Sequence, residues 1–268
     1  MLLRAGIAVA AALVTLTGTA AADPGDVSTQ VVGGSRASTK DFPFTVFLAK
    51  TGKKSSFCGG SIIAPNKILT AAHCVDEGET GPKPVPPSSI QVVAGRDDKD
   101  TGDGVVAGVT KIVLHPKWDG WFFDAAVLTL DRRLPQKPIS LAGPLDSGLY
   151  QPGKKATVLG WGDTTEGGSS SRFLLKARIP ILPDNDCRKF WGKFEDGVDV
   201  YQTKSMTCAA VMAGGIDACQ GDSGGPFVEN GKLIGLVKAG QGCARPNAPA
   251  IYTRTNAINN WVNQEIHR

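Results

Sequence analysis

Apolar residues along this chain gather in short runs rather than in long periodic stretches. Short runs bounded by Gly, Pro, Asn and Asp are typical of β-strands joined by turns. They predict strands at residues 44–49, 61–63, 67–70, 112–114, 125–130, 155–160, 173–179, 226–228 and 232–237. Asn230-Gly231 between the last two runs is a hairpin-turn signal. The pattern therefore predicts a β-rich fold.

Only the end of the chain follows a helical period. Ile258, Trp261, Val262 and Ile266 recur at helical spacing, and Asn256 is a candidate N-cap. We expect a packed terminal helix with no direct catalytic task.

The first 22 residues have the features of a secretory signal. Arg4 supplies a positive start, residues 7–16 form a short apolar run, and Ala20-Ala21-Ala22 is a small-residue cleavage site. Neither this run nor a later segment reaches the roughly 18 apolar residues of a spanning helix. We expect an exported, extracellular protein with no membrane segment, in which the polar residues 23–30 are a short propeptide.

Composition narrows the classes of fold and partner. The chain is 41% hydrophobic with 33 glycines and 17 prolines, which suits many short strands in one large or two small units. The net charge of +4 is too small and too dispersed to indicate a nucleic-acid partner. Residues 76–89 and 96–104 have the composition of surface loops, and residues 131–153 that of a linker between two halves.

Six cysteines in an exported chain indicate disulfides, although six allow 15 pairings from sequence alone. No Cys-x-x-Cys or His-x-x-x-His spacing occurs, so we expect no metal site. The loop 96–104 holds four aspartates but fails the EF-hand template, which needs a carboxylate where Val109 stands. Calcium binding is left open.

The strongest chemical signal is the sequence Cys-Gln-Gly-Asp-Ser-Gly-Gly-Pro at residues 219–226. A serine among glycines allows close approach of a substrate and leaves amide groups free to face a developing oxyanion, as acyl transfer requires. An ordinary turn and the nucleophile elbow of α/β-hydrolases are the alternatives. The elbow needs an acid and then a histidine after the serine. No Asp follows Ser223 and the only later histidine is His267, next to the last residue, whereas His73 and Asp124 precede the serine.

Further motifs accompany the serine in a fixed order. They are Val31-Val32-Gly33-Gly34, Cys58-Gly59-Gly60-Ser61, Thr70-Ala71-Ala72-His73-Cys74, Asp124-Ala125-Ala126-Val127-Leu128, Gly160-Trp161-Gly162 and Gly221-Asp222-Ser223-Gly224-Gly225-Pro226. Together they resemble the chymotrypsin-like serine endopeptidases of the trypsin group, over essentially the whole chain after Gln30. The resemblance implies an all-β fold of two six-stranded antiparallel β-barrels with a C-terminal helix, divided here as residues 31–140 and 141–268.

The resemblance also implies roles for single residues. Ser223 resembles the nucleophile, His73 the general base and then acid, and Asp124 the carboxylate that orients His73. The N–H groups of Gly221 and Ser223 would form the oxyanion hole. The implied disulfides are Cys58–Cys74, Cys187–Cys208 and Cys219–Cys243.

Substrate choice and activation follow from the same resemblance. Asp217 matches the carboxylate of a pocket that accepts Arg or Lys, and Gly240, Gly242 and Ala250 match its walls. Cleavage after residue 30 would free the Val31 amine to pair with Asp222. The implied partners are protein or peptide substrates and proteinaceous protease inhibitors, for a secreted monomer that needs no cofactor.

Three residues depart from the family pattern. Lys238-Ala239 stands where the family carries Ser-Trp, and Ala250 replaces a second glycine of the pocket wall. Lys238 either places a charge near Asp124 or turns its ammonium to solvent, and we expect the latter. The predicted function is a secreted endopeptidase cutting after Arg or Lys through an acyl-enzyme. The alternative is a protease-fold binding or regulatory protein with little turnover.

Overall fold

The computed structural model describes residues 32–268, and the predicted signal peptide, the propeptide and Val31 lie outside them. Thirteen strands, two α-helices and three short 3-10 helices follow one another in this part of the chain. The strands are β1 (Ser35–Arg36), β2 (Thr45–Lys50), β3 (Ser56–Ala64), β4 (Lys67–Thr70), β5 (Ile90–Ala94), β6 (Val105–Leu114), β7 (Ala126–Leu130), β8 (Lys155–Gly160), β9 (Leu175–Pro180), β10 (Met206–Ala209), β11 (Pro226–Glu229), β12 (Lys232–Ala239) and β13 (Ala250–Arg254). The helices are η1 (Ala72–Cys74), η2 (Pro87–Ser89), η3 (Pro144–Tyr150), α1 (Asp184–Trp191) and α2 (Thr255–Ile266).

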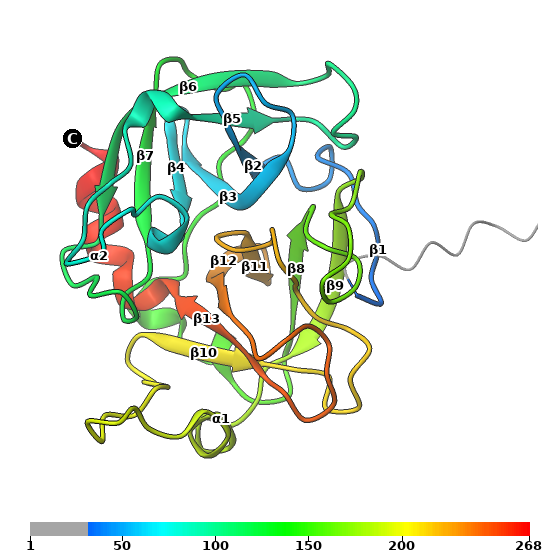
Figure 1. The fold of residues 1–268 in the computed structure, drawn as a ribbon, viewed down its shortest axis with the longest axis vertical. Helices are drawn as coiled ribbons and strands as arrows, with labels where there is room; N and C mark the ends of the chain where they lie inside the picture. Colours follow the sequence, from blue (N-terminus) through cyan, green and yellow to red (C-terminus); the bar gives the residue numbers. More distant parts are fainter. Residues whose placement is uncertain (1–31) are drawn as a thin grey trace, which may run out of the picture.

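The first half of the chain forms a closed antiparallel barrel with the strand order β2-β3-β4-β7-β6-β5 (Figure 1). Closure removes the free edges that an open sheet would expose. Apolar side chains from all six strands fill its interior, among them Val46, Ile62, Ile68, Val92 and Leu128. The predicted all-β fold is confirmed in this half.

The second half forms a sheet with the order β1-β9-β8-β11-β12-β13-β10. Strands β8 to β13 are the six that the resemblance implies, and β1 adds two residues at the outer edge of β9. Just beyond β9, the N–H of Leu182 donates to the carbonyl of Cys208 in β10 at 3.0 Å. This bond links β9 to β10, which stand at opposite ends of the strand order when β1 is left out. The second sheet therefore curls into a barrel, with β1 as a seventh strand.

A separate apolar cluster lies between the two barrels and under the terminal helix. Phe47 of β2 packs edge-on against Trp161, which follows β8, with ring centroids 5.1 Å apart. Ile258 and Val262 of α2 belong to the same cluster and are buried. This packing fixes one barrel against the other, so residues from both can meet at one site.

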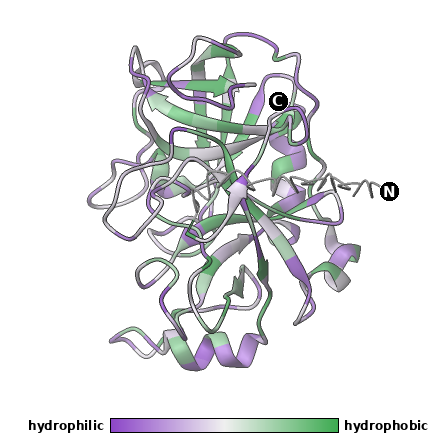
Figure 2. Ribbon diagram, turned by 90° about the vertical axis from the view of Figure 1, so that its right-hand side faces the viewer, coloured by the Kyte–Doolittle hydropathy of each residue, from purple (hydrophilic) through white to green (hydrophobic). Residues whose placement is uncertain are grey.

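The chain crosses from one barrel to the other between β7 and β8. The N–H of Ile139 donates to Ile62 in the first barrel, and the N–H of Ala142 donates to Leu233 in the second, each at 2.9 Å. The domain boundary at residues 140 and 141 stays a prediction. Figure 2 shows hydrophobic residues along the strands and many hydrophilic ones in the connecting loops. Within residues 32–268, no helix is long and apolar enough to cross a membrane.

One local prediction at the terminal helix is wrong. Asn256 is not the N-cap, because the helix already begins at Thr255 after Arg254. The hydroxyl of Thr255 donates to the carbonyl of Leu233 at 2.6 Å, which anchors the helix start on β12. Asn256 lies inside the first turn, where its N–H donates to the hydroxyl of Tyr150.

Candidate active site

His73 sits in a single 3-10 turn that a disulfide holds against the first barrel. Cys74, the next residue, is bonded to Cys58 of β3. The backbone N–H of His73 donates to Oδ1 of Asp124 at 3.0 Å, and its Nδ1 lies 2.7 Å from Oδ2 of the same carboxylate. The side chain is 35% exposed on its other edge. Asp124 therefore fixes both the backbone and the ring orientation of His73.

Asp124 is completely buried at the end of a tightly folded loop. The Asp119 carboxylate accepts the N–H groups of Trp121 and Phe122, and Phe123 adopts a left-handed conformation with φ of 53°. Its ring stacks on His115, which holds the strained residue in place. The pKa of Asp124 is lowered: although burial opposes ionisation, the bonds and charge of His73 outweigh it, and nearby Lys238 adds to them.

Ser223 comes from the second barrel and lies in the loop before β11. Its carbonyl accepts the N–H of Gly59 in β3 at 2.7 Å, which ties the serine loop to the first barrel. Gly221 has φ of 90°, a conformation that a side chain would strain. Among the described residues, neither Gly221 nor Ser223 donates its backbone N–H to another backbone group. These two N–H groups are thus available to a ligand.

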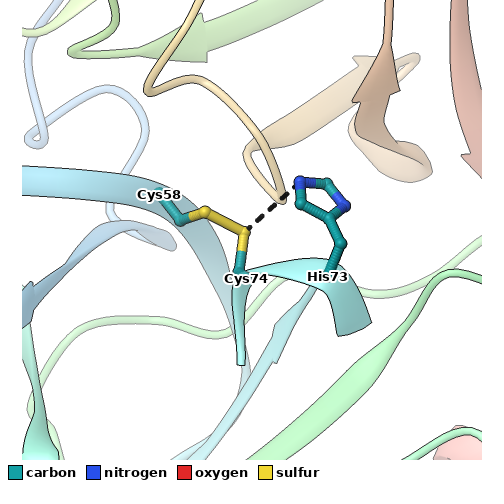
Figure 3. Close-up of side chains that lie close together, drawn as sticks. All are labelled: Cys58, His73 and Cys74. Atoms are coloured by element: carbon teal, nitrogen blue, oxygen red, sulfur yellow. Dashed lines mark hydrogen bonds between the residues drawn. A yellow bond between two sulfur atoms is a disulfide. The ribbon is translucent and has the colours of Figure 1, made fainter. Parts of the chain in front are cut away.

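His73 and Ser223 are not yet joined by a hydrogen bond within the described part of the chain. Nε2 of His73 instead lies 3.8 Å from Sγ of Cys74, as Figure 3 shows. Hydrogen bonds of this kind are often long in enzymes without substrate and tighten in the complex. The structure therefore presents the histidine–carboxylate pair in place and the serine within the adjoining cavity wall.

The residues of Figure 3 are also the one close group of possible metal ligands within residues 32–268. The sulfur atoms of Cys58 and Cys74 are bonded to each other, so neither can act as a thiolate ligand. None of the aspartates of the loop 96–104 belongs to such a group. Asp97 accepts hydrogen bonds from Ser38 and Thr39, and Asp98 pairs with Arg172.

A cavity of about 220 Å³ opens beside Ser223. Its lining includes Gly240, Gly242 and Ala250, whose predicted role in substrate binding stays a prediction. A Cβ at Gly240 would lie 3.0 Å from the Gly242 carbonyl and 3.8 Å from the Ala250 methyl, so the walls are already close there. The disulfide between Cys219 and Cys243 joins two sides of the cavity.

Asp217 is buried next to this cavity rather than within its lining. It is 3% exposed, and its carboxylate accepts the N–H groups of Ala218, a lining residue, and Ala244. Burial raises the pKa of Asp217 to about 7, and the neighbouring Asp222 adds to the increase. No cationic side chain of the described residues lies within ion-pair distance. An ionised Asp217 therefore has no cationic partner among the described residues.

Asp222, the residue before Ser223 in the serine loop, is fully buried. Its two oxygens accept the N–H groups of Gly162 and Cys219, at 2.8 and 2.9 Å. Gly160 and Gly162 must be glycines here, because a Cβ at either would lie 2.0 to 2.5 Å from the carboxylate. Burial nevertheless raises the pKa of Asp222 to about 6. The first described residue, Val32, accepts the backbone N–H of Asp217 through its carbonyl at 3.2 Å.

Two buried lysines near the site were not expected. Lys99 donates to the hydroxyls of Ser56 and Ser170, and its charge acts on Asp222. Lys238 does not turn to solvent, so that prediction is wrong. Its side chain is 3% exposed and its Nζ lies 3.8 Å from Oδ2 of Asp124. A lysine in a loop or at a strand end is usually solvated, and the sequence carries no signal that either would be enclosed.

The remaining disulfide lies away from the site and joins α1 to β10 through Cys187 and Cys208. All three disulfides thus join the pairs that the resemblance implies. Their cysteines are the only ones in the described residues, and none is free.

Comparison with known proteins gives a consistent result. The family model described as Trypsin matches residues 31–262. A trypsin of Saccharopolyspora erythraea is 42% identical over 239 residues, covering 88% of this chain and 98% of the relative.

Animal relatives extend the match. Trypsin eta of Drosophila erecta is 34% identical and covers 88% of this chain and 90% of its own length. Trypsin-1 of Astacus astacus is 34% identical, covering 87% of this chain and 98% of its own length. With both barrels, the histidine–aspartate pair and the serine loop in place, the chain belongs to the trypsin family and is a trypsin-like serine endopeptidase.

Proposed function

We propose that this protein is a secreted endopeptidase that cuts after Arg or Lys through an acyl-enzyme. The observation that carries the proposal is the hydrogen-bonded His73–Asp124 pair beside a cavity that Ser223 lines and the buried acid Asp217 adjoins. The His73–Asp124 pair and Ser223 would supply the catalytic groups, and Asp217 would supply the preference for Arg and Lys.

In the proposed reaction, the Ser223 hydroxyl attacks the scissile carbonyl and Nε2 of His73 takes its proton. Asp124 keeps the proton on Nδ1 and stabilises the imidazolium that forms. The carbonyl oxygen gains negative charge and is met by the N–H groups of Gly221 and Ser223, one of which is worth about 3 kcal/mol in related chemistry. His73 then protonates the leaving amine, and water, activated by His73, hydrolyses the acyl-Ser223 ester.

The uncompensated Asp217 supports selection of Arg and Lys. A buried carboxylate without a cationic partner is unfavourable, and the head group of a long cationic side chain would supply the missing charge. Gly240 leaves the cavity wall open to such a side chain, while the Ala250 methyl narrows it relative to a glycine. The substrates proposed are therefore proteins and peptides with Arg or Lys before the cut bond.

We extend the proposal to activation by cleavage after Gln30. The Val31 ammonium would then pair with Asp222, whose full burial and raised pKa leave it in need of a cation. The proposal is supported by the next residue, Val32, whose carbonyl accepts the backbone N–H of Asp217 at 3.2 Å. A Gln does not suit an acidic pocket, so we expect slow self-activation and cleavage by another protease.

Stoichiometric labelling with a serine-directed phosphonylating reagent tests the function. The chain cut after Gln30 is expected to bind one reagent at Ser223, and the uncut precursor to label at least tenfold more slowly. The Ser223→Ala variant, cut in the same way, is the control. A cut chain that folds but takes up no reagent would favour the alternative, a regulatory protein with little turnover.

A further inference from the structure

Lys238 is a charged residue enclosed beside the catalytic pair. Its Nζ lies 3.8 Å from Oδ2 of Asp124, the same oxygen that holds Nδ1 of His73 at 2.7 Å. On its other side the ammonium lies 3.5 Å from the ring centroid of Trp121, within the range of a cation–π contact. One carboxylate oxygen is thus shared by a lysine and the histidine.

The strand that carries Lys238 is shaped to point it there. Val237 pairs with Tyr252 and Ala239 with Ile251, so the register of β12 against β13 skips Lys238. A bulge of this kind leaves one residue without a partner and turns its side chain, often next to an active site. The contact with Asp124 therefore follows from the backbone as well as from the length of the side chain.

The surroundings decide whether the lysine keeps its charge. Burial lowers the pKa of Lys238, while the carboxylates of Asp124 and Asp119 oppose the decrease. Trp121 adds a favourable face for a cation, and His73 is the other titratable group on Asp124. Two nearby carboxylates and an aromatic face can hold an ammonium that is almost entirely removed from water.

We propose that Lys238 is a positioning residue of the proteolytic reaction, which acts on His73 through Asp124 by competing for Oδ2. The inference rests on the proposed function. A fixed positive charge near Asp124 makes the protonated form of His73 less favourable. Two consequences follow: His73 stays in the neutral, reactive form at lower pH, and the imidazolium formed during attack is stabilised less, so turnover is slower.

The test compares pH profiles of kcat for the matured enzyme, its Lys238→Met variant and its Lys238→Arg variant. Methionine keeps an unbranched stem and removes the charge, whereas arginine keeps the charge. In Lys238→Met, the acidic limb is expected to move up by about one pH unit and kcat at pH 8 to rise about threefold. Lys238→Arg is expected to shift the limb by no more than about one-third of that amount. An unmoved limb in Lys238→Met, with lower kcat, would mean that Lys238 only supports the fold.

A second measurement does not need activity. In the Ser223→Ala background, NMR titration of the His73 ring is compared between chains with and without the Lys238→Met substitution. The titration midpoint is expected to rise by about one pH unit without the lysine, and equal midpoints would overturn the proposal. If the Lys238→Met variant does not fold, Lys238→Gln takes its place. A protein that shows no hydrolysis but a shifted midpoint would refute the proposed function and the role of Lys238 in turnover, and would confirm only that Lys238 acts on His73 through Asp124.

Discussion

The buried carboxylates of the two barrels have pKa shifts in opposite directions. Asp124 meets His73 and Lys238, both carried by the folded chain, and its pKa is lowered. Asp217 and Asp222 in the second half meet only backbone N–H groups as hydrogen-bond donors, and their pKa values are raised to about 7 and about 6. All three acids are almost inaccessible to water. The difference is therefore one of partners and not of burial.

This difference indicates where the missing partners come from. The proposed catalytic pair is complete within the chain, whereas Asp217 and Asp222 have no ion-pair partner among the described residues, and on the proposed function the substrate and a new amino terminus would bring one. An acid whose pKa rises on folding favours its protonated form in the folded state. On the proposed function, the second half would be the part of the molecule that responds to cleavage and to substrate, and the following substitutions test that division.

The largest effect is expected where the two halves meet. Ser223→Ala and His73→Ala should each lower kcat by about 10⁴-fold or more, and the double variant should be little worse, because the two groups act as one unit. The assay is hydrolysis of a peptide amide with Arg before the cut, by enzyme matured with a removable protease. Ser55→Ala, at an exposed serine, is the control. Losses that multiply in the double variant would refute the joint role.

Substitution in the pocket should change selection and spare the chemistry. Asp217→Ser should reduce the ratio of kcat/KM for Arg over Leu substrates by about a thousandfold, since the buried cation loses its counter-charge. The kcat for the Leu substrate should change little. Asp41→Ser removes an exposed carboxylate instead. Peptide-library profiles that remain identical would exclude Asp217 as the selecting residue.

The same acid should reduce stability at alkaline pH. Its folded pKa of about 7 lies above its unfolded value of 3.8, so stability present below the unfolded pKa is lost as the pH rises through about 7. Asp217→Asn should therefore raise the free energy of unfolding at pH 8 by about 3 kcal/mol and change it little at pH 4. Denaturant unfolding in the Ser223→Ala background measures this, and an equal effect at both pH values would contradict it.

A smaller effect of opposite sign is expected in the first half. His115 packs between Phe123 and Trp261, and burial lowers its pKa to about 4 from an ordinary 6.5. Folded protein then binds fewer protons than unfolded, so stability falls as the pH drops from about 6.5 to about 4. In His115→Phe, the loss between pH 7 and pH 4.5 should be smaller by about 2 kcal/mol. His267→Phe, at an exposed histidine, should lose as much as the parent chain.

The sequence predicted the strands where short apolar runs stand between clear turns. Residues 67–70 and 155–160 match β4 and β8 as they form, and Asn230 and Gly231 both take the positive φ of a hairpin turn. The short helix α1 was missed, because its eight residues include four charged ones and only one buried one, Cys187. The strand β10 was missed because Thr207 inside it and Ser205 just before it are polar but buried.

The residues of the candidate site could be predicted where they lie in short, recognisable sequence motifs. Such motifs identify His73, Asp124 and Ser223, and the structure brings His73 and Asp124 into contact. The state of Lys238 was not predictable, because it depends on a bulge in β12 and on Trp121, which is distant in sequence. Asn256 was wrongly predicted to be the N-cap because Thr255 anchors the start of the helix instead, by donating to Leu233 of β12.

The most direct test of this difference between the halves measures the protons that the protein releases when a cation binds in the cavity beside Ser223. Binding of benzamidinium, a small planar cation, is followed by calorimetry at pH 7 in buffers that differ in ionisation enthalpy. Since the pKa of Asp217 is about 7 in the free protein, about half a proton should be released for each cation bound, and none at pH 9. Asp217→Asn should release none. Binding at pH 7 that releases no proton in the parent protein would contradict the account, because Asp217 would then already be ionised without a partner.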